Sequence, residues 1–342
     1  MNPLFTALNS PHAICHEIAL RTTPMWQRLV EYYADFYTQV SIAERFTAHS
    51  AEKQDGNGVL MPAHEDTDYY FVGDLHGNFE TLVSIICYAC EKSPHPHLLL
   101  LGDAIDRGAE DFALLALIQD CLMGAHGDVF SLCYICGNHD FALDVKPNGF
   151  FFSAVSPADT TNHLNTLSKS GHASQAHVLG KAAIELARIS PYMGELVWQN
   201  NSLIFAHACT PHTDNQALLQ EFFGEQTVPN IFEKLPDEIL FPCRDDFMRG
   251  MLRTQMQHVA PQRGFLAATQ GTDDMAAYFT LHHTLTGRRI LGMLRGHDHV
   301  ANGHRLTTLR NGFICTLNAL GPGNTTIAAF NCINGISFIR LD

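Results

Sequence analysis

Polar side chains that can bind a metal or move a proton follow three short apolar runs, at residues 69–72, 98–101 and 132–136. These side chains are Asp74, His76, Asp103, Asp106, Arg107, Asn138 and His139. Carboxylate, imidazole and amide groups are ligands for divalent cations, and the planar arginine fork suits phosphate oxygens. The pattern predicts a metal site with a basic clamp beside it.

The three apolar runs are expected to be buried strands, because each has four or five apolar residues followed by turn residues. The stretches between them, 79–90 and 110–123, fit helices that return the chain to the sheet. This βαβαβ order implies right-handed crossovers and an at least partly parallel sheet. Since ligands gather outside the carboxyl ends of such strands, the polar side chains should meet there.

Two later apolar runs, at 202–206 and 290–294, end in further histidines: His207 after the first, and His297 and His299 after the second. The tail then alternates short β patterns at 312–317, 325–330 and 336–341, and Asn334-Gly335 is a good hairpin turn between the last two.

The residue types at these five strand ends suit two adjacent cations. One ligand set is Asp74, His76 and Asp103; the other is Asp103, Asn138, His207 and His297. Two divalent ions about 3.5–4 Å apart would clamp a phosphate and lower the pKa of a bridging water. Each motif alone is weak evidence, because Gly-Asp after a strand is commonly a turn. Their joint occurrence favours a dinuclear site.

His139 directly follows a predicted ligand, so its side chain can face the substrate and act as general acid, with Asp106 orienting it. Arg107 offers two parallel donors for phosphate oxygens, and the Asn138 amide is also expected on the substrate side.

Length and composition set the broad class. The chain has 342 residues, 46% of them hydrophobic and 16% charged, so it can bury a sizeable core. A net charge of −14 argues against broad binding to nucleic acid or anionic membranes.

The 10 cysteines lie mostly inside apolar runs and are expected to be reduced core residues. No run approaches the ~20 residues of a membrane span and no Sec-type signal opens the chain, which predicts a cytoplasmic protein.

The chain divides into an appendage at 1–66 and a catalytic domain at 67–342. The appendage has helix-like spacing over 25–46, and 51–68 is interpreted as a loop or linker. A polar insertion at about 146–190 is expected to form a loop or helical excursion over the site, with a short helix at 181–188, and to set substrate selectivity. The stretch 210–287 is interpreted as mostly helical.

Three motifs carry a family resemblance: Gly-Asp-x-His-Gly at 73–77, Gly-Asp-x-x-Asp-Arg-Gly at 102–108 and Gly-Asn-His-Asp at 137–140. With the distant histidines, they resemble the calcineurin-like metallophosphoesterases. The Asp-Arg-Gly narrows this to the PPP branch: serine/threonine phosphatases, their bacterial relatives and symmetrical diadenosine tetraphosphatases. The resemblance covers roughly 69–342.

The resemblance implies an α/β fold, a four-layer α/β/β/α sandwich, to which this chain adds an N-terminal helical segment. It implies two divalent ions, of manganese, iron or zinc, with manganese expected here. The implied metal ligands are Asp74, His76, Asp103, Asn138, His207 and His297. His139 and Asp106 would form the acid pair, and Arg107 would hold phosphate.

The sequence departs from the PPP pattern in several places. Asp140 stands where eukaryotic members usually have glutamate. His299 is an additional histidine that in the wider superfamily reaches the first metal, so it is expected either to bind that metal or to support the site. A second phosphate-binding arginine is expected at Arg249, with Arg244 as the other candidate. The family's tyrosine near its final Ala-Pro-Asn segment has no counterpart at 317–323.

The leading hypothesis is a phosphatase that hydrolyses phosphomonoesters on proteins, at serine or threonine and conceivably tyrosine, by in-line attack of a metal-bridging hydroxide. The alternative is a symmetrical diadenosine tetraphosphate hydrolase, and a third is a catalytically idle scaffold, which the filled ligand positions disfavour. The expected partner is a phosphoprotein, with no nucleic acid and no membrane insertion, and the oligomeric state is not predicted. Some bacterial relatives are delivered into host cells as effectors, which leaves that localisation open.

Overall fold

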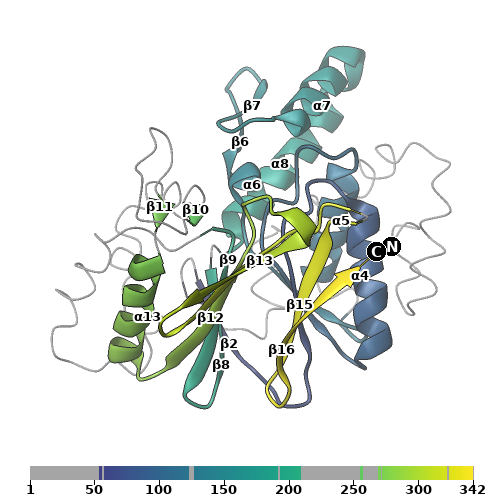
Figure 1. Ribbon diagram of the computed structural model, residues 1–342. Helices are drawn as coiled ribbons and strands as arrows, with labels where there is room; N and C mark the ends of the chain where they lie inside the picture. Colours follow the sequence, from purple (N-terminus) through teal and green to yellow (C-terminus); the bar gives the residue numbers. More distant parts are fainter. Residues whose placement is uncertain are drawn as a thin grey trace.

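Two β-sheets pack face to face in the computed structural model, with helices on their outer faces (Figure 1). The structure describes residues 54–55, 58–122, 127–191, 193–208, 255–256, 269–270, 272–321 and 323–341. This arrangement confirms the predicted α/β class and the four-layer order of helices, sheet, sheet and helix.

The five-stranded sheet has the order β16-β15-β3-β4-β5. Its strands are β3 (Tyr69–Val72), β4 (His97–Leu100), β5 (Ser131–Tyr134), β15 (Thr325–Asn331) and β16 (Gly335–Leu341). β3, β4 and β5 are parallel, as predicted, whereas β15 runs antiparallel to β3 and forms a hairpin with β16. The three strands that carry the first three motifs are therefore neighbours.

These strands are apolar on both faces because each face meets a different core. Tyr70 and Val72 of β3 belong to the cluster against the helices, while Phe71 faces the other sheet. There the Phe71 ring meets the Phe205 ring edge-on at 5.9 Å between centroids. Burial on both faces explains why continuous apolar runs, rather than alternating ones, formed these strands.

The seven-stranded sheet has the order β1-β2-β8-β9-β12-β14-β13. Its strands are β1 (Gln54–Asp55), β2 (Gly58–Pro62), β8 (Met193–Trp198), β9 (Asn201–Ala206), β12 (Arg289–Arg295), β13 (His304–Leu309) and β14 (Gly312–Leu317). β9, β12 and β14 are mutually parallel, so the ends of β9 and β12 lie side by side.

The interpretation of residues 51–68 as a loop or linker is wrong for residues 58–62, which form strand β2. β2 pairs in parallel with β8, and the buried side chains Val59 and Met61 join the core between the sheets. β2 is thus a strand of the seven-stranded sheet. The predicted helix over 25–46 lies outside the described residues, and the division at residue 66 stays a prediction.

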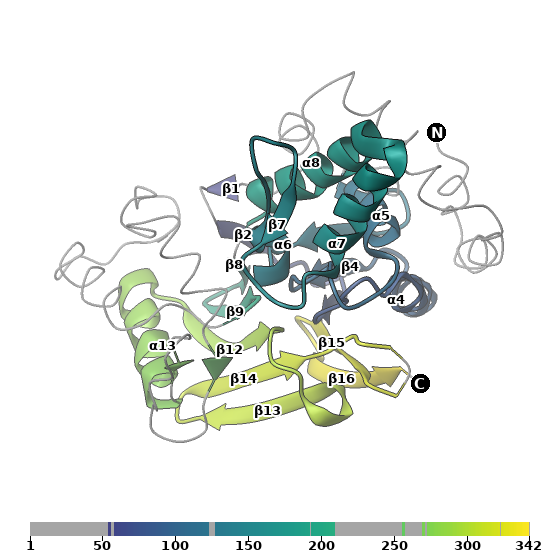
Figure 2. The same cartoon turned by 90° about the horizontal axis from the view of Figure 1, so that it is seen from above.

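Helices cover the five-stranded sheet on one side and the seven-stranded sheet on the other (Figure 2). The first group is α4 (Phe79–Lys92), α5 (Asp111–Leu122) and α8 (Ala173–Ile189), and α13 (Thr272–Thr286) packs against β12 and β13. α4 begins at Asn78, whose side chain accepts the Thr81 N–H at 3.2 Å and so caps the helix. The helices predicted at 79–90 and 110–123 are confirmed by α4 and α5.

The insertion is a helical excursion. After the short helix α6 (Asn138–Ala142) come the hairpin β6 (Leu143–Val145) and β7 (Phe151–Ser153), then α7 (Asp159–Leu167), a π-helical segment (Ser168–His172) and α8. The helix predicted at 181–188 is the second half of α8.

Most of the stretch 210–287 lies outside the described residues, apart from β10 (Gln255–Met256), β11 (Thr269–Gln270) and α13. Among the helices of the described residues, none combines the length and apolar character that a bilayer crossing requires.

Candidate metal centre

The carboxyl ends of five strands from both sheets converge at one edge of the sandwich. β3, β4 and β5 deliver the first three motifs from one sheet, and β9 and β12 deliver His207 and His297 from the other. The two sheets meet through side chains here: the Nε2 atom of His207 lies 3.3 Å from Oδ2 of Asp103. The predicted residues therefore form one cluster.

One part of the cluster is built on Asp74 and His76. Nε2 of His76 lies 3.9 Å from Oδ2 of Asp74 and 3.8 Å from Oδ2 of Asp103. The imidazole of His299 reaches the same place, because ligand atoms of Asp74, His76 and His299 all lie within 4.8 Å of one another. His299 is exposed, whereas the two others are buried.

The second part gathers around Asn138. Its Oδ1 atom lies 3.0 Å from Nε2 of His207 and 2.8 Å from Nδ1 of His297. Ligand atoms of Asp103, His207 and His297 also fall within 4.8 Å of one another. Asp103 thus takes part in both groups, in the place expected for a bridging carboxylate.

Backbone carbonyls fix the orientation of two of these imidazoles. Nδ1 of His76 donates to the Ile105 carbonyl and Nδ1 of His207 donates to the Leu101 carbonyl, each at 2.8 Å. A carbonyl oxygen can only accept, so Nδ1 carries the proton in both rings. Nε2 is then turned toward the cluster, as in metal-binding histidines whose other nitrogen is hydrogen-bonded.

The donor set fits divalent cations. Oδ2 of Asp74 and Nε2 of His76 are buried and have no hydrogen-bond partner in the described part of the chain, although both point into the cluster. Burial, reinforced by the Asp103 carboxylate, raises the pKa of Asp74 to about 7, and burial lowers the pKa of His76 to about 4. A buried carboxylate oxygen and a buried imidazole nitrogen that both lack a hydrogen bond form a site that a cation would stabilise.

Asp140 braces the second motif against the third. Its Oδ2 accepts the N–H groups of Asp103 and Gly137 at 2.8 Å each, and its Oδ1 accepts those of Ala104 and Ile105 at 3.0 and 3.3 Å. Four buried backbone donors on two loops are therefore satisfied by one carboxylate, which fixes Asp103 relative to the start of α6.

The backbone of the site is held in an uncommon conformation. Seven non-glycine residues of the described chain have φ between 45° and 69°, and five of them are predicted site residues. These five are His76, Asp103, Asp106, Arg107 and His297. Such left-handed geometry costs roughly 1–3 kcal/mol at each position and is typical of functional sites whose surroundings enforce it.

Two glycines allow the loops to approach this closely. A side chain at Gly137 would collide with the backbone of Asp103, and one at Gly296 would collide with the carboxylate of Asp74. Both glycines are therefore required for the close packing between these loops.

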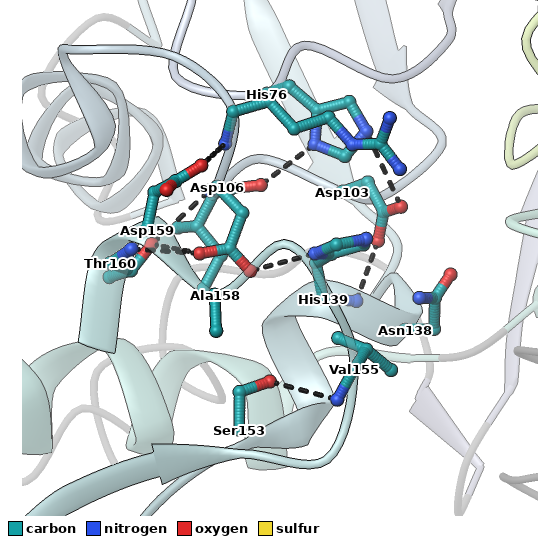
Figure 3. Close-up of polar contacts among 12 residues, drawn as sticks. His76, Asp103, Asp106, Asn138, His139, Ser153, Val155, Ala158, Asp159 and Thr160 are labelled. Atoms are coloured by element: carbon teal, nitrogen blue, oxygen red, sulfur yellow. Dashed lines mark hydrogen bonds and ion pairs between the residues drawn. The ribbon is translucent and has the colours of Figure 1, made fainter. Parts of the chain in front are cut away.

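His139 and Asp106 form a buried pair at the mouth of the cluster (Figure 3). Nδ1 of His139 lies 2.7 Å from Oδ2 of Asp106, and the His139 N–H donates to Oδ1 of Asp103 at 2.9 Å. Burial opposes the imidazolium form, but the hydrogen bond to Asp106 and the nearby carboxylates outweigh it and raise the pKa of His139. The pair can hold a proton beside the candidate metal ligands.

Arg107 lies at the edge of an open hollow of about 440 Å³ next to the cluster. His76, Arg107 and His299 line the hollow together with Asn78 and Glu110. The guanidinium is exposed, so it is available to an anion entering from solvent.

The structure brings together ten of the eleven predicted site residues; Arg249 lies outside the described residues. The sequence did not single out Thr160, which contacts Asp106 from the insertion. The available signal was the polar pair Asp159-Thr160 at the start of a helix, a pattern that is usually a helix cap.

Comparison with known proteins agrees with this geometry. The family model described as calcineurin-like phosphoesterase matches residues 68–241. A solved protein serine/threonine phosphatase from Saccharomyces cerevisiae superposes with a TM-score of 0.59 at 14% identity, covering 95% of this chain and 92% of its own. At that identity the likeness concerns the fold.

Curated relatives match over shorter stretches. Serine/threonine-protein phosphatase 1 of Salmonella typhimurium is 29% identical over 150 residues, which is 43% of this chain and 61% of the relative. A symmetrical bis(5'-nucleosyl)-tetraphosphatase of Actinobacillus pleuropneumoniae is 33% identical over 106 residues, 28% of this chain and 37% of the relative. The matches thus span less than two thirds of either relative. With the family match over half of its length, the chain belongs to the calcineurin-like phosphoesterases.

Proposed function

We propose that this phosphoesterase is a metal-dependent phosphoprotein phosphatase that cleaves phosphomonoesters of serine and threonine, with phosphotyrosine as the further substrate to be tested. The observation that carries the proposal is the buried His139–Asp106 pair directly beside two candidate ligand atoms, on Asp74 and His76, that have no hydrogen-bond partner among the described residues. A proton donor next to a cation site suits the expulsion of an alkoxide from a phosphate ester.

The proposed ligands are Asp74, His76, Asp103, Asn138, His207 and His297, with His299 as a further ligand on the Asp74 side. Manganese is the proposed metal. Two bound divalent ions would supply Lewis-acid stabilisation of phosphoryl oxygens and lower the pKa of a coordinated water. The neutral Asn138 limits the negative charge that surrounds them.

The chain's own groups would orient the ester and protonate the leaving group. Arg107 would hold the phosphoryl oxygens with its guanidinium fork, since it is exposed at the edge of the hollow. His139 would give its Nε2 proton to the departing oxygen, while its Nδ1–H stays bonded to Asp106. Asp106 thereby fixes the ring and offsets the positive charge of the imidazolium.

Hydrolysis of diadenosine tetraphosphate is the second candidate, favoured by the similarity to the symmetrical tetraphosphatase and by Asp140 in the third motif. An adenine needs an aromatic or arginine surface to stack on. Among the described residues that line the hollow there is no phenylalanine, tyrosine or tryptophan, and the arginine present, Arg107, is the group proposed to hold phosphate. A comparison of the two substrates therefore decides between the candidates.

The test is a comparison of kcat/KM on metal-stripped, manganese-reloaded protein. The substrates are phosphoserine, phosphothreonine and phosphotyrosine peptides beside diadenosine tetraphosphate. Asp103→Asn is the inactive variant, and Asp128→Asn, at an exposed position on a turn, is its matched control. Preference for the peptides, lost in Asp103→Asn alone, supports the proposal. Preference for the dinucleotide, or activity that survives in Asp103→Asn, overturns it.

A cytoplasmic location, delivery into a host cell and selectivity through the insertion stay predictions of the sequence. The insertion does reach the site, however, through the first turn of α7.

A further inference from the structure

The His139–Asp106 pair continues into the insertion through Thr160. Oδ1 of Asp106 accepts both the backbone N–H of Thr160, at 2.9 Å, and its hydroxyl proton, at 2.7 Å. In return, the backbone N–H of Asp106 lies 3.2 Å from Oγ1 of Thr160. Three contacts between two residues 54 positions apart fix the Asp106 carboxylate in one orientation.

A fourth residue, Asp111, closes the chain of contacts. Oγ1 of Thr160 lies 2.7 Å from Oδ2 of Asp111 at the start of α5. His139, Asp106, Thr160 and Asp111 are all at most 3% exposed, so water does not replace these contacts. Figure 3 shows Thr160 and the start of α7 on the side of Asp106 opposite to His139.

The number of protons available to the Thr160 hydroxyl and its two carboxyl neighbours decides which group donates in each hydrogen bond. The Thr160 hydroxyl has one proton but two carboxyl oxygens within 2.7 Å, and an ionised carboxylate cannot donate. Both contacts are hydrogen bonds when Asp111 carries a proton and donates to Thr160, which then donates to Asp106. Burial raises the pKa of Asp111 to about 7, with the Asp106 carboxylate adding to the shift, which agrees with this direction.

We propose that Thr160 is a positioning residue for proton transfer: as the middle member of the hydrogen-bonded chain Asp111–Thr160–Asp106–His139, it aims the Asp106 carboxylate at the imidazole of the general acid. This inference rests on the proposed phosphatase function. The insertion would then contribute to the chemical step through α7, besides any role in binding substrate.

Asp159, which precedes Thr160 in α7, holds Arg107, which follows Asp106. Oδ2 of Asp159 accepts the backbone N–H of Arg107 at 3.1 Å. Asp106 and Arg107 both have φ of 68°, a conformation that needs support from outside the loop. The first two residues of α7 supply that support.

The inference makes a claim about the leaving group. An alkoxide from phosphoserine needs a proton as the bond breaks, whereas a nitrophenolate is stable without one. Loss of the Thr160 hydroxyl should therefore slow hydrolysis of a phosphoserine peptide far more than hydrolysis of p-nitrophenyl phosphate. A merely structural defect would slow both alike.

Three variants isolate the hydroxyl. Thr160→Ala removes the hydroxyl and the methyl group, while Thr160→Ser removes the methyl group alone. Thr161→Ala is the matched control, because Thr161 is the next buried residue of α7 and its hydroxyl donates to the Ala158 carbonyl at 2.7 Å instead of to Asp106. Equal thermal midpoints of Thr160→Ala and Thr161→Ala show that folding is comparable.

We expect Thr160→Ala to lower kcat on the phosphoserine peptide by about 10–100-fold, the range for partners that orient a site's imidazoles. On p-nitrophenyl phosphate the loss should stay below about threefold, since little protonation is needed. Thr160→Ser and Thr161→Ala should behave as wild type on both. Equal losses on the two substrates, no loss, or an equal effect of Thr161→Ala overturns the inference.

A readout independent of activity, made on variants with equal thermal midpoints, separates this inference from the proposed function. In protein loaded with diamagnetic Mg²⁺, the Nδ1–H proton of His139 should give a low-field NMR signal that His139→Ala abolishes. The signal should persist in Thr160→Ser and shift or broaden in Thr160→Ala; an unchanged signal in Thr160→Ala overturns the inference. Wild-type protein that shows the signal but hydrolyses no phosphate ester contradicts the proposed function alone.

Discussion

Replacing Asp140 by asparagine should destabilise the fold strongly, although the two side chains have the same size. The carboxylate accepts four backbone N–H groups, two at each oxygen, and only 4% of the residue is exposed. An amide has one acceptor oxygen, so whichever way it is flipped, its NH₂ group faces two donors. The substitution leaves no cavity, and its effect is therefore almost entirely one of hydrogen bonding.

The magnitude follows from those two donors. A buried N–H without an acceptor costs about 1–3 kcal/mol, so Asp140→Asn should lower the free energy of unfolding by about 2–6 kcal/mol. For a domain of this size the midpoint of thermal unfolding should fall by at least about 3 °C.

The assay is equilibrium urea unfolding in the presence of EDTA, so that a change in metal affinity does not alter the apparent stability. Asp144→Asn is the matched control from the adjacent strand β6. The Asp144 carboxylate makes an exposed ion pair of 3.5 Å with Arg188, and its loss should cost less than about 1 kcal/mol. If Asp140→Asn is no more destabilising than Asp144→Asn, the idea that Asp140 braces the two metal-binding loops is wrong.

Three further predictions concern the acid, the metal and acid stability. His139→Ala should lower kcat by about 10²–10⁴-fold with unchanged manganese content. The control His163→Ala, on the exposed face of α7, should have no effect. Unchanged turnover in His139→Ala would refute the role of His139 as the general acid. Asp74→Asn should weaken manganese binding in calorimetric titrations by at least about tenfold, and equal affinity would exclude Asp74 as a ligand. Burial opposes ionisation of Glu195, but the nearby His282 and Arg288 outweigh burial and lower the pKa of Glu195 from 4.5 to about 2. Because that pKa is depressed in the folded state, the Glu195 carboxylate stabilises the protein above pH 4.5 and loses this contribution as the pH falls toward 2. Glu195→Gln should therefore flatten the dependence of the unfolding free energy on pH between 4.5 and 2.

The elements that the sequence predicts well are those whose burial is uniform. β3 and β4 are apolar over nearly their whole length and are interior strands of their sheet, so their bounds match the apolar runs to within one residue. Asp74 and Asp103 follow these strands closely, which leaves little freedom in where they lie. Most of the predicted cluster could therefore be read from the sequence.

The elements that escaped prediction depend on pairing between distant segments. β2 has the short sequence Gly-Val-Leu-Met-Pro between polar stretches and becomes a strand by pairing with β8, more than 130 residues later. Strand formation of this kind depends on the neighbour more than on intrinsic preference. The start of α8 was hidden because the kink at Gly171, with φ of 91°, interrupts the helical pattern before it.

Thr160 escaped prediction for a related reason. Its hydroxyl could have bonded to the backbone of its own helix, as threonines in a first helical turn often do, and Thr161 does so by donating to the Ala158 carbonyl. Nothing in the local sequence distinguishes the two. The difference lies in the path of the insertion, which brings the start of α7 to Asp106 across 54 residues.

The candidate metal ligands and the Asp106 carboxylate are held in place by different parts of the chain. The candidate metal ligands follow strands of the two sheets, and Asp140 braces Asp103 from within the third motif itself. The orientation of Asp106, in contrast, depends on Thr160 and thus on the insertion. Within the described part of the chain, the hydrogen bonds of α7 to the site go to Asp106 and Arg107 and not to the candidate metal ligands. Under the proposed mechanism, a change in α7 should therefore alter proton transfer to the leaving group while metal binding stays the same. The helix would in this way influence which esters are cleaved by tuning the acid as well as by contacting the substrate.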